Sequence, residues 1–230
     1  MNTESTNADA AHRLARAAGW LYLVTFVTSI PALALKTPAL EGTGLATNAH
    51  IAALIEIVLA LACVGTAVTL YPILSRYEPA SALGFIASRT LEATLVLVGV
   101  VALLTVVSLR EGEANSEVIS AVVGLHDGAF LLGPGLLPAV NAALLGGVLY
   151  RTRLVPRVIP LIGLIGAPLL AASAIATMFG AFDQVSAMAG MAALPIAVWE
   201  FALGCWLAVR GAHRKPTRQM SLASRSSSST

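Results

Sequence analysis

Charged side chains within long apolar stretches are the first feature of this sequence with chemical consequences. Arg89 and Glu92 stand three residues apart in one stretch, and Glu200 stands about ten residues from the end of another. Residues three apart share a helix face, so Arg89 is expected to pair with Glu92 and to reach Glu200 across a bundle. Two carboxylates against one guanidinium leave one acid unmatched. We expect that acid, for which Glu200 is the candidate, to hold a proton and to serve a proton relay.

A second group of polar side chains comprises Glu56, His126 and Asp127. We interpret them as an outer vestibule above the first group. If they converge with Glu200, carboxylates and an imidazole have the ligand chemistry of a divalent metal site. The sequence contains neither an HExxH nor a Glu-x-x-His motif, so no cofactor is predicted, and a haem held by His50 and His126 is a further alternative.

The apolar stretch 118–150 is too long for one membrane crossing, and two interpretations of its first part are open. Residues 118–125 form a short interfacial helix with Asp127 as the N-cap of the next helix, or the whole stretch is one interrupted span. Gly133-Pro134-Gly135 predicts an interruption or a kink. Asn141 follows it and is a site candidate, because broken helices line binding sites in transporters.

The composition indicates the elements that position these residues. Of the 230 residues, 57% are hydrophobic and only 11% are charged, against roughly 25% charged in soluble domains. This excludes a soluble domain, a disordered chain and a disulfide scaffold. A bilayer core requires about 20 apolar residues per helix. The segments that meet this requirement are 17–35, 51–74, 81–109, 118–150, 158–182 and 185–209. The sequence therefore predicts an all-α polytopic bundle of six spans over residues 17–210.

The distribution of lysine and arginine predicts the orientation. Eleven of the 14 such residues lie on the side of the two termini, whereas Lys36 and Arg110 lie in loops on the other side and Arg89 lies in a span. Cytoplasmic loops collect positive residues, so we expect both termini inside. Aromatic residues, Tyr22 and Trp206 among them, are expected at the inner interface, which agrees with this orientation.

The chain ends are expected to be disordered, because residues 1–16 and the Ser-rich residues 211–230 contain too few apolar side chains to pack. A cleavable signal peptide is the alternative for the first span, since Arg13 and Arg16 precede an apolar run that includes Ala32-Leu33-Ala34. That run is longer than a typical signal core, which favours a transmembrane helix.

Four elements carry a resemblance to a known family: Ser88-Arg89-x-x-Glu92, His126-Asp127, Gly133-Pro134-Gly135 and Trp199-Glu200. From about residue 11 to residue 210 the chain resembles a family of bacterial six-span membrane proteins that is catalogued only as a domain of unknown function. The resemblance implies a location in the bacterial plasma membrane. It supplies no catalytic residue, cofactor or substrate.

The sequence favours binding or transport of a small molecule or an ion by a membrane protein. The candidate residues are Glu200, Glu92, Arg89, Glu56, Asp127, His126 and Asn141. A structural or regulatory protein whose buried charges lock the bundle is one alternative. A membrane-embedded metal-dependent enzyme is the other, and an enzymatic role is the less favoured interpretation. The expected surrounding of the protein is a lipid bilayer, and a homo-oligomer is possible. Nucleic acid is not an expected partner, because most positive residues lie where membrane orientation requires them.

Overall fold

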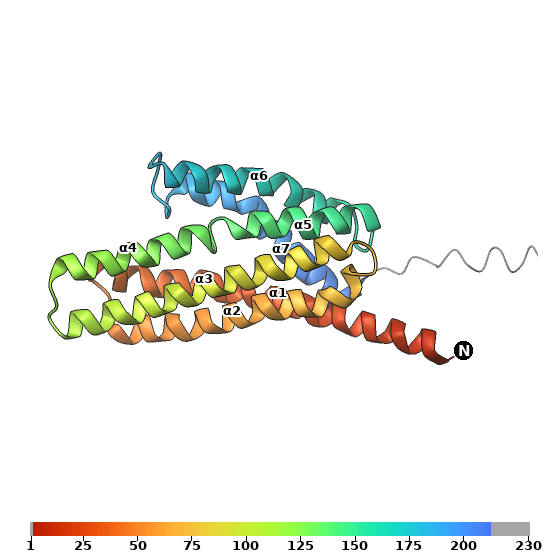
Figure 1. The fold of residues 1–230 in the computed structure, drawn as a ribbon, viewed down its shortest axis with the longest axis horizontal. Helices are drawn as coiled ribbons and strands as arrows, with labels where there is room; N and C mark the ends of the chain where they lie inside the picture. The colour runs from red at the N-terminus through yellow and green to blue at the C-terminus, as the bar shows by residue number, and fades with distance from the viewer. Residues whose placement is uncertain (1, 213–230) are drawn as a thin grey trace, which may run out of the picture.

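Seven α-helices build the described part of the protein (Figure 1). The computed structural model describes residues 2–212, with side chains described from residue 9 onward. The helices are α1 (Asn2–Glu41), α2 (Ala46–Leu74), α3 (Pro79–Glu111), α4 (Ser116–Leu132), α5 (Leu137–Thr152), α6 (Val158–Met178) and α7 (Ala187–Arg210). Within these residues six segments are long and apolar enough to cross a membrane, because α4 and α5 together make one segment. The prediction of an all-α fold with six spans is confirmed.

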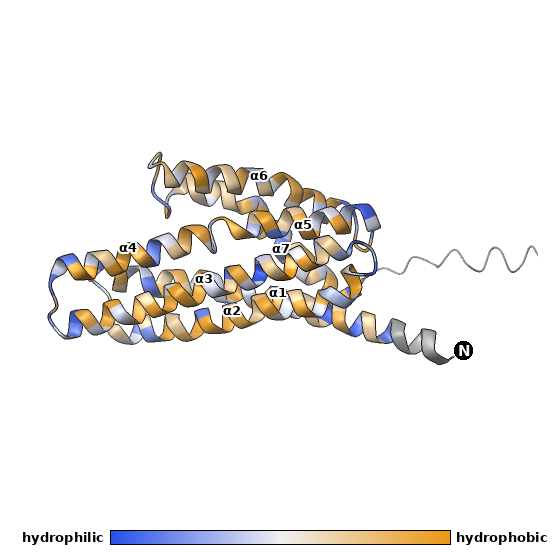
Figure 2. Ribbon diagram, in the orientation of Figure 1, coloured by the Kyte–Doolittle hydropathy of each residue, from blue (hydrophilic) through white to orange (hydrophobic). Residues whose placement is uncertain are grey.

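The outer surface of the bundle is apolar along most of its length. Large side chains such as Val27, Leu61 and Val101 are 65 to 68% exposed. Figure 2 shows hydrophobic residues along the helices and hydrophilic ones gathered mainly at the two ends of the bundle. Helices that are apolar on all sides, rather than along one stripe, are typical of lipid surroundings.

The helices close into a ring. Helix α1 packs against α2 and α7, α2 against α3, α3 against both α4 and α5, α5 against α6, and α6 against α7. Arg16 Nε donates a hydrogen bond of 3.0 Å to the carbonyl oxygen of Ala208, which places the first and last helices side by side. A Cβ atom at Gly19 would lie 2.2 Å from Ala208 N. A glycine in α1 therefore permits the close approach that closes the ring.

The interruption predicted at Gly133-Pro134-Gly135 separates α4 from α5, which lie end to end in Figure 1. A Cβ atom at Gly135 would lie 2.4 Å from the carbonyl oxygen of Leu131. The interpretation of residues 118–125 as a separate interfacial helix, with Asp127 as the next N-cap, is wrong. Helix α4 is continuous from Ser116, its N-cap is Asn115, and Asp127 lies in its interior.

Two helix boundaries differ from the sequence analysis. Helix α1 begins at Asn2, so residues 2–16, which were expected to be disordered, are helical. The alanines of this segment favour helix, and Ala15 is fully buried. Helix α6 ends at Met178 and α7 begins at Ala187, so the connection between them is longer than residues 183–184. Residues 213–230 of the Ser-rich tail lie outside the described residues.

Candidate functional site

Arg89 on α3 is the centre of a buried polar cluster. Its Nη1 donates to Glu92 Oε2 at 2.8 Å, and its Nη2 donates to Glu200 Oε1 on α7 at 3.3 Å. The Arg89 side chain is 1% exposed, that of Glu92 is 7% exposed and that of Glu200 is 17% exposed. The predicted pairing of one arginine with two carboxylates is confirmed.

Two further helices contribute to this cluster, which we call the Arg89 cluster. Asn141 on α5 donates from Nδ2 to the same Glu92 oxygen at 2.6 Å. Tyr22 on α1 presents its ring to the guanidinium, with Arg89 Cζ 5.1 Å from the ring centroid. Such a cation–π contact stabilises a desolvated arginine. The four contributing helices form two neighbouring pairs, α1 with α7 and α3 with α5, which α2 and α6 separate around the ring, so the cluster lies in its interior.

The two carboxylates are held differently. Glu92 accepts two short hydrogen bonds, from Arg89 and Asn141, whereas Glu200 accepts one longer bond from Arg89. With all three groups ionised, the cluster carries one excess negative charge, which a low-dielectric interior disfavours. Glu200 is therefore the acid that is free to gain a proton or to meet a ligand.

Several polar atoms near Arg89 are buried without a hydrogen-bond partner among the described residues. They are Arg89 Nε, Asn141 Oδ1 and Tyr22 Oη. An unpaired buried polar atom costs about 1–3 kcal/mol. The cluster thus retains donors and acceptors that its own side chains do not use.

A cavity of about 240 Å³ adjoins the Arg89 cluster. Arg89, Glu92 and Glu200 form its charged wall, and Phe26 of α1 lines it as well. Pro134, in the interruption between α4 and α5, is another lining residue. The helix break and the unmatched acid therefore meet at one cavity.

Lys36 and Glu56 form a second buried cluster between α1 and α2. Lys36 Nζ lies 2.6 Å from Glu56 Oε1, and the two residues are 2% and 5% exposed. Lys36 Nζ also lies 4.3 Å from the centroid of the Phe130 ring on α4. His126 stacks on Phe130 with ring centroids 6.2 Å apart, and its Nδ1 lies 3.0 Å from Asp127 Oδ1. In the described part of the chain, Glu56 Oε2 and His126 Nε2 have no partner.

The outer-loop position predicted for Lys36 is wrong, because Lys36 lies within α1 and is buried. Helix α1 continues to Glu41, and the Glu56 carboxylate draws the lysine into the bundle because a buried acid requires a cation. A lone lysine between apolar residues, with Glu56 unmatched in the next span, was the available signal. Tyr22, expected at the inner interface, is fully buried against Arg89 instead.

The structure does not join the two clusters into a metal site. Nowhere in residues 9–212 do three His, Cys, Asp or Glu side chains lie close enough together to hold a metal ion. Asp127 is mainly exposed, with 58% of its side chain accessible. His50 is exposed at the start of α2, where its Nδ1 lies 2.7 Å from the Ala46 carbonyl oxygen.

Six membrane-spanning segments around a buried polar cluster define a multi-pass membrane protein. The family described as "Domain of unknown function (DUF4386)" matches residues 17–211, and the chain belongs to this family. This agrees with the resemblance found in the four sequence elements. No curated protein and no solved structure matches the chain.

Proposed function

We propose that this protein binds a small molecule or an ion at the Arg89 cluster and carries it across the membrane. One observation carries the proposal: Glu200, the more weakly held and more exposed of the two acids in the cluster, lines a cavity of about 240 Å³. A charged side chain in hydrocarbon costs about 2.5–3.5 kcal/mol on insertion scales, so its presence there points to a function by default.

The charge balance of the cluster supports Glu200 as the exchanging group. When Glu200 holds a proton, the Arg89–Glu92 pair is neutral and keeps its short hydrogen bond of 2.8 Å. When Glu200 releases the proton, the cluster gains a negative charge that a bound cation or donor compensates. Proton binding and ligand binding then compete for one carboxylate, which is the coupling that a proton-linked carrier requires.

The interruption between α4 and α5 supports transport rather than static binding. Irregular backbone at membrane depth is tolerated where it lines a cavity, and transporters use such breaks at their binding sites. Pro134 of this interruption lines the same cavity as Glu200. We propose that α4 and α5 move independently about the break.

We further propose an orientation with both termini inside, in the bacterial plasma membrane. Eleven of the 14 lysines and arginines lie at the termini or in the loops on their side of the bundle, which favours this orientation. On this basis Glu200 lies near the membrane midplane, about 15 Å from the inner end of its span. Glu56, His126 and Asp127 lie nearer the outer surface.

Proton flux into liposomes tests the proposal. Purified protein is reconstituted with an internal pH-sensitive dye, and a potassium diffusion potential drives protons inward. We expect flux from the wild-type protein, no flux above empty liposomes from Glu200→Gln, and wild-type flux from Glu117→Gln. Glu117 is an exposed residue of α4 and gives a matched control. Normal flux through Glu200→Gln would exclude Glu200 from the mechanism, and no flux in the wild type would exclude proton conduction through Glu200.

A structural lock is the second candidate function. The observation that favours it is the network itself, because Arg89 joins carboxylates on two helices and Asn141 adds a third helix. A buried ion pair of this kind specifies helix rotation and register. If the cluster is a structural lock, both Glu92 and Glu200 are required for stability. If it is a binding site, only Glu92 is required for stability.

A further inference from the structure

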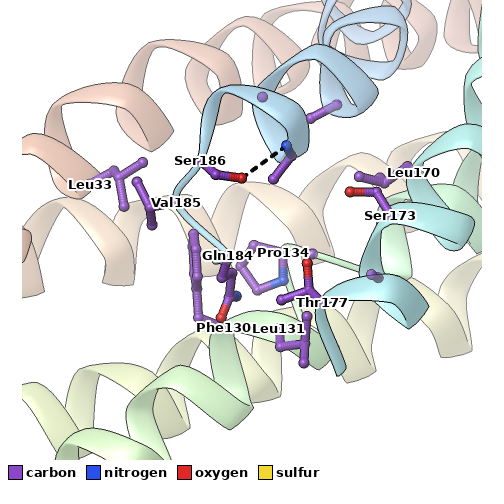
Figure 3. A pocket seen from close by; sticks show the side chains of 15 residues that line it. Leu33, Phe130, Leu131, Pro134, Leu170, Ser173, Thr177, Gln184, Val185 and Ser186 are labelled. Carbon is purple, nitrogen blue, oxygen red and sulfur yellow. Dashed lines mark hydrogen bonds between the residues drawn. The ribbon is translucent and has the colours of Figure 1, made fainter. Parts of the chain in front are cut away.

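A second cavity lies next to the one at Arg89. It has a volume of about 230 Å³ and lies between α4, α6 and α7, close to α1. Pro134, Leu170 and Ala193 line both cavities, so the two are neighbours across these side chains. Figure 3 shows Pro134 beneath the start of α7 and Leu170 on α6 at one side of the second cavity.

The two cavities differ in chemical character. The first has a charged wall of Arg89, Glu92 and Glu200. The second is lined mainly by apolar side chains, and its polar groups are uncharged. Figure 3 shows the hydroxyl groups of Ser173 and Thr177 on the α6 side of this cavity. The first cavity is therefore suited to a charged group, and the second cavity is suited to an apolar one.

We infer that the two cavities form one binding site for a molecule that carries a single cationic group on an apolar body. This inference rests on the proposed function and specifies its ligand class. The cationic group lies beside Glu200, whose carboxylate is the acid in excess, and beside the Phe26 ring. The apolar body lies in the second cavity, against side chains such as Phe130 and Leu131.

Charge favours a cation over an anion. The guanidinium already donates to both acids, at 2.8 and 3.3 Å, and the sum of the three charges is negative when Glu200 is ionised. An anionic ligand would be repelled by this excess negative charge, whereas a cationic ligand neutralises it and lies in a cavity that Phe26 also lines. Glu92 is bound by Arg89 and Asn141, so the cation meets Glu200.

The combined size favours a molecule larger than a simple ion. Pockets for small molecules measure about 300–1,000 Å³ and are mostly apolar with a few placed polar groups. Each cavity alone, at about 240 and 230 Å³, falls below this range, and the two together fall within it. An inorganic cation would leave the apolar cavity without a role.

Glycines provide matched variants for a test. A Cβ atom at Gly190, in the wall of the second cavity, meets nothing within 4 Å, so the backbone there accepts a side chain, and Gly190→Leu is the first filling variant. Gly128 on the exposed side of α4 is equally unobstructed, and Gly128→Leu is the control. Ala174→Leu is a second filling variant, since Ala174 is buried and lines only the second of the two cavities.

The probe is benzyltrimethylammonium, titrated calorimetrically into the protein in phosphatidylcholine nanodiscs, with empty nanodiscs subtracted. We expect millimolar or tighter binding to the wild type and to Gly128→Leu. We expect binding at least about tenfold weaker in Glu200→Gln, Gly190→Leu and Ala174→Leu. Tetramethylammonium, which lacks the apolar body, is expected to bind about tenfold more weakly than the probe and to be insensitive to Gly190→Leu. Benzylsulfonate, an anion of similar shape, is expected not to bind.

The contrary outcomes separate this inference from the proposed function. Unchanged probe binding in both filling variants, with a loss in Glu200→Gln, would overturn the two-cavity site and leave binding at the Arg89 cluster standing. Unchanged binding in Glu200→Gln would overturn both. Stronger binding of benzylsulfonate than of the cation would overturn the assignment of charge, and no binding of the cation to the wild type would overturn the ligand class.

Discussion

Glu92→Gln and Glu200→Gln remove the same charge from the Arg89 cluster, but we expect them to differ in their effect on stability. Glu92 lies 2.8 Å from Arg89 and also accepts a bond of 2.6 Å from Asn141. Glu200 lies 3.3 Å from Arg89 and its side chain is 17% exposed. The substitution at Glu92 therefore weakens two short buried contacts, and the substitution at Glu200 weakens one long contact.

The magnitudes follow from these contacts. Removing one partner of a buried ion pair costs about 3–5 kcal/mol. We expect about 3 kcal/mol for Glu92→Gln, the lower limit, because Glu200 still compensates the charge of Arg89. Hydrogen bonds between membrane helices contribute about 0.6 kcal/mol on average. We expect about 0–1 kcal/mol for Glu200→Gln, since the loss of one bond is offset by removal of the excess negative charge.

Reversible unfolding by dodecyl sulfate in mixed micelles, followed by circular dichroism, measures the difference. It is expected to be at least about 2 kcal/mol, or about 30-fold in the unfolding equilibrium constant. The exposed Glu117→Gln provides the control and is expected to unfold as the wild type does. Equal destabilisation by Glu92→Gln and Glu200→Gln would refute the reasoning and identify Glu200 as part of a structural lock. A neutral Glu92→Gln would refute the assignment of Glu92 as the main partner of Arg89.

Three further predictions concern other contacts. Lys36→Met leaves a carboxylate unpaired in the bundle and is expected to lower the free energy of unfolding by about 3–5 kcal/mol; the same unfolding assay checks this, and a neutral result would contradict the buried pair. Gly19→Ala is expected to destabilise by about 1–3 kcal/mol through collision with the α7 backbone. Gly147→Ala, with open space around it, is expected to be neutral or stabilising, so similar unfolding curves for the two glycine variants would contradict the close approach. The hydrogen bond from Arg151 lowers the pKa of Glu78 in the loop before α3. The ionised Glu78 carboxylate therefore stabilises the fold above the usual carboxyl pKa of about 4.3, and this contribution is lost as the pH falls through the lowered pKa. The difference in melting temperature between wild type and Glu78→Gln is expected at neutral pH and is expected to vanish in strong acid, whereas a difference independent of pH would contradict this.

The sequence alone determined the features that depend on local chemistry. Hydropathy over about 20 residues identified the six spans, because a helix that crosses lipid needs apolar side chains and must satisfy its backbone hydrogen bonds within itself. The spacing of Arg89 and Glu92 determined their pairing, since residues three apart share a helix face. Gly133-Pro134-Gly135 identified the helix interruption, because proline and glycine disfavour a continuous helix.

The tertiary structure decided which helices meet and which side chains face one another. The contact of Tyr22 with Arg89, the bond from Asn141 to Glu92 and the pairing of Lys36 with Glu56 all join different helices. In a soluble helix, polarity distinguishes the outer face from the inner one. Here lipid-facing and buried faces are both apolar, so the sequence does not reveal how each helix is rotated. The order of helices around the ring and their rotation bring four helices to one cluster and form the cavities beside it.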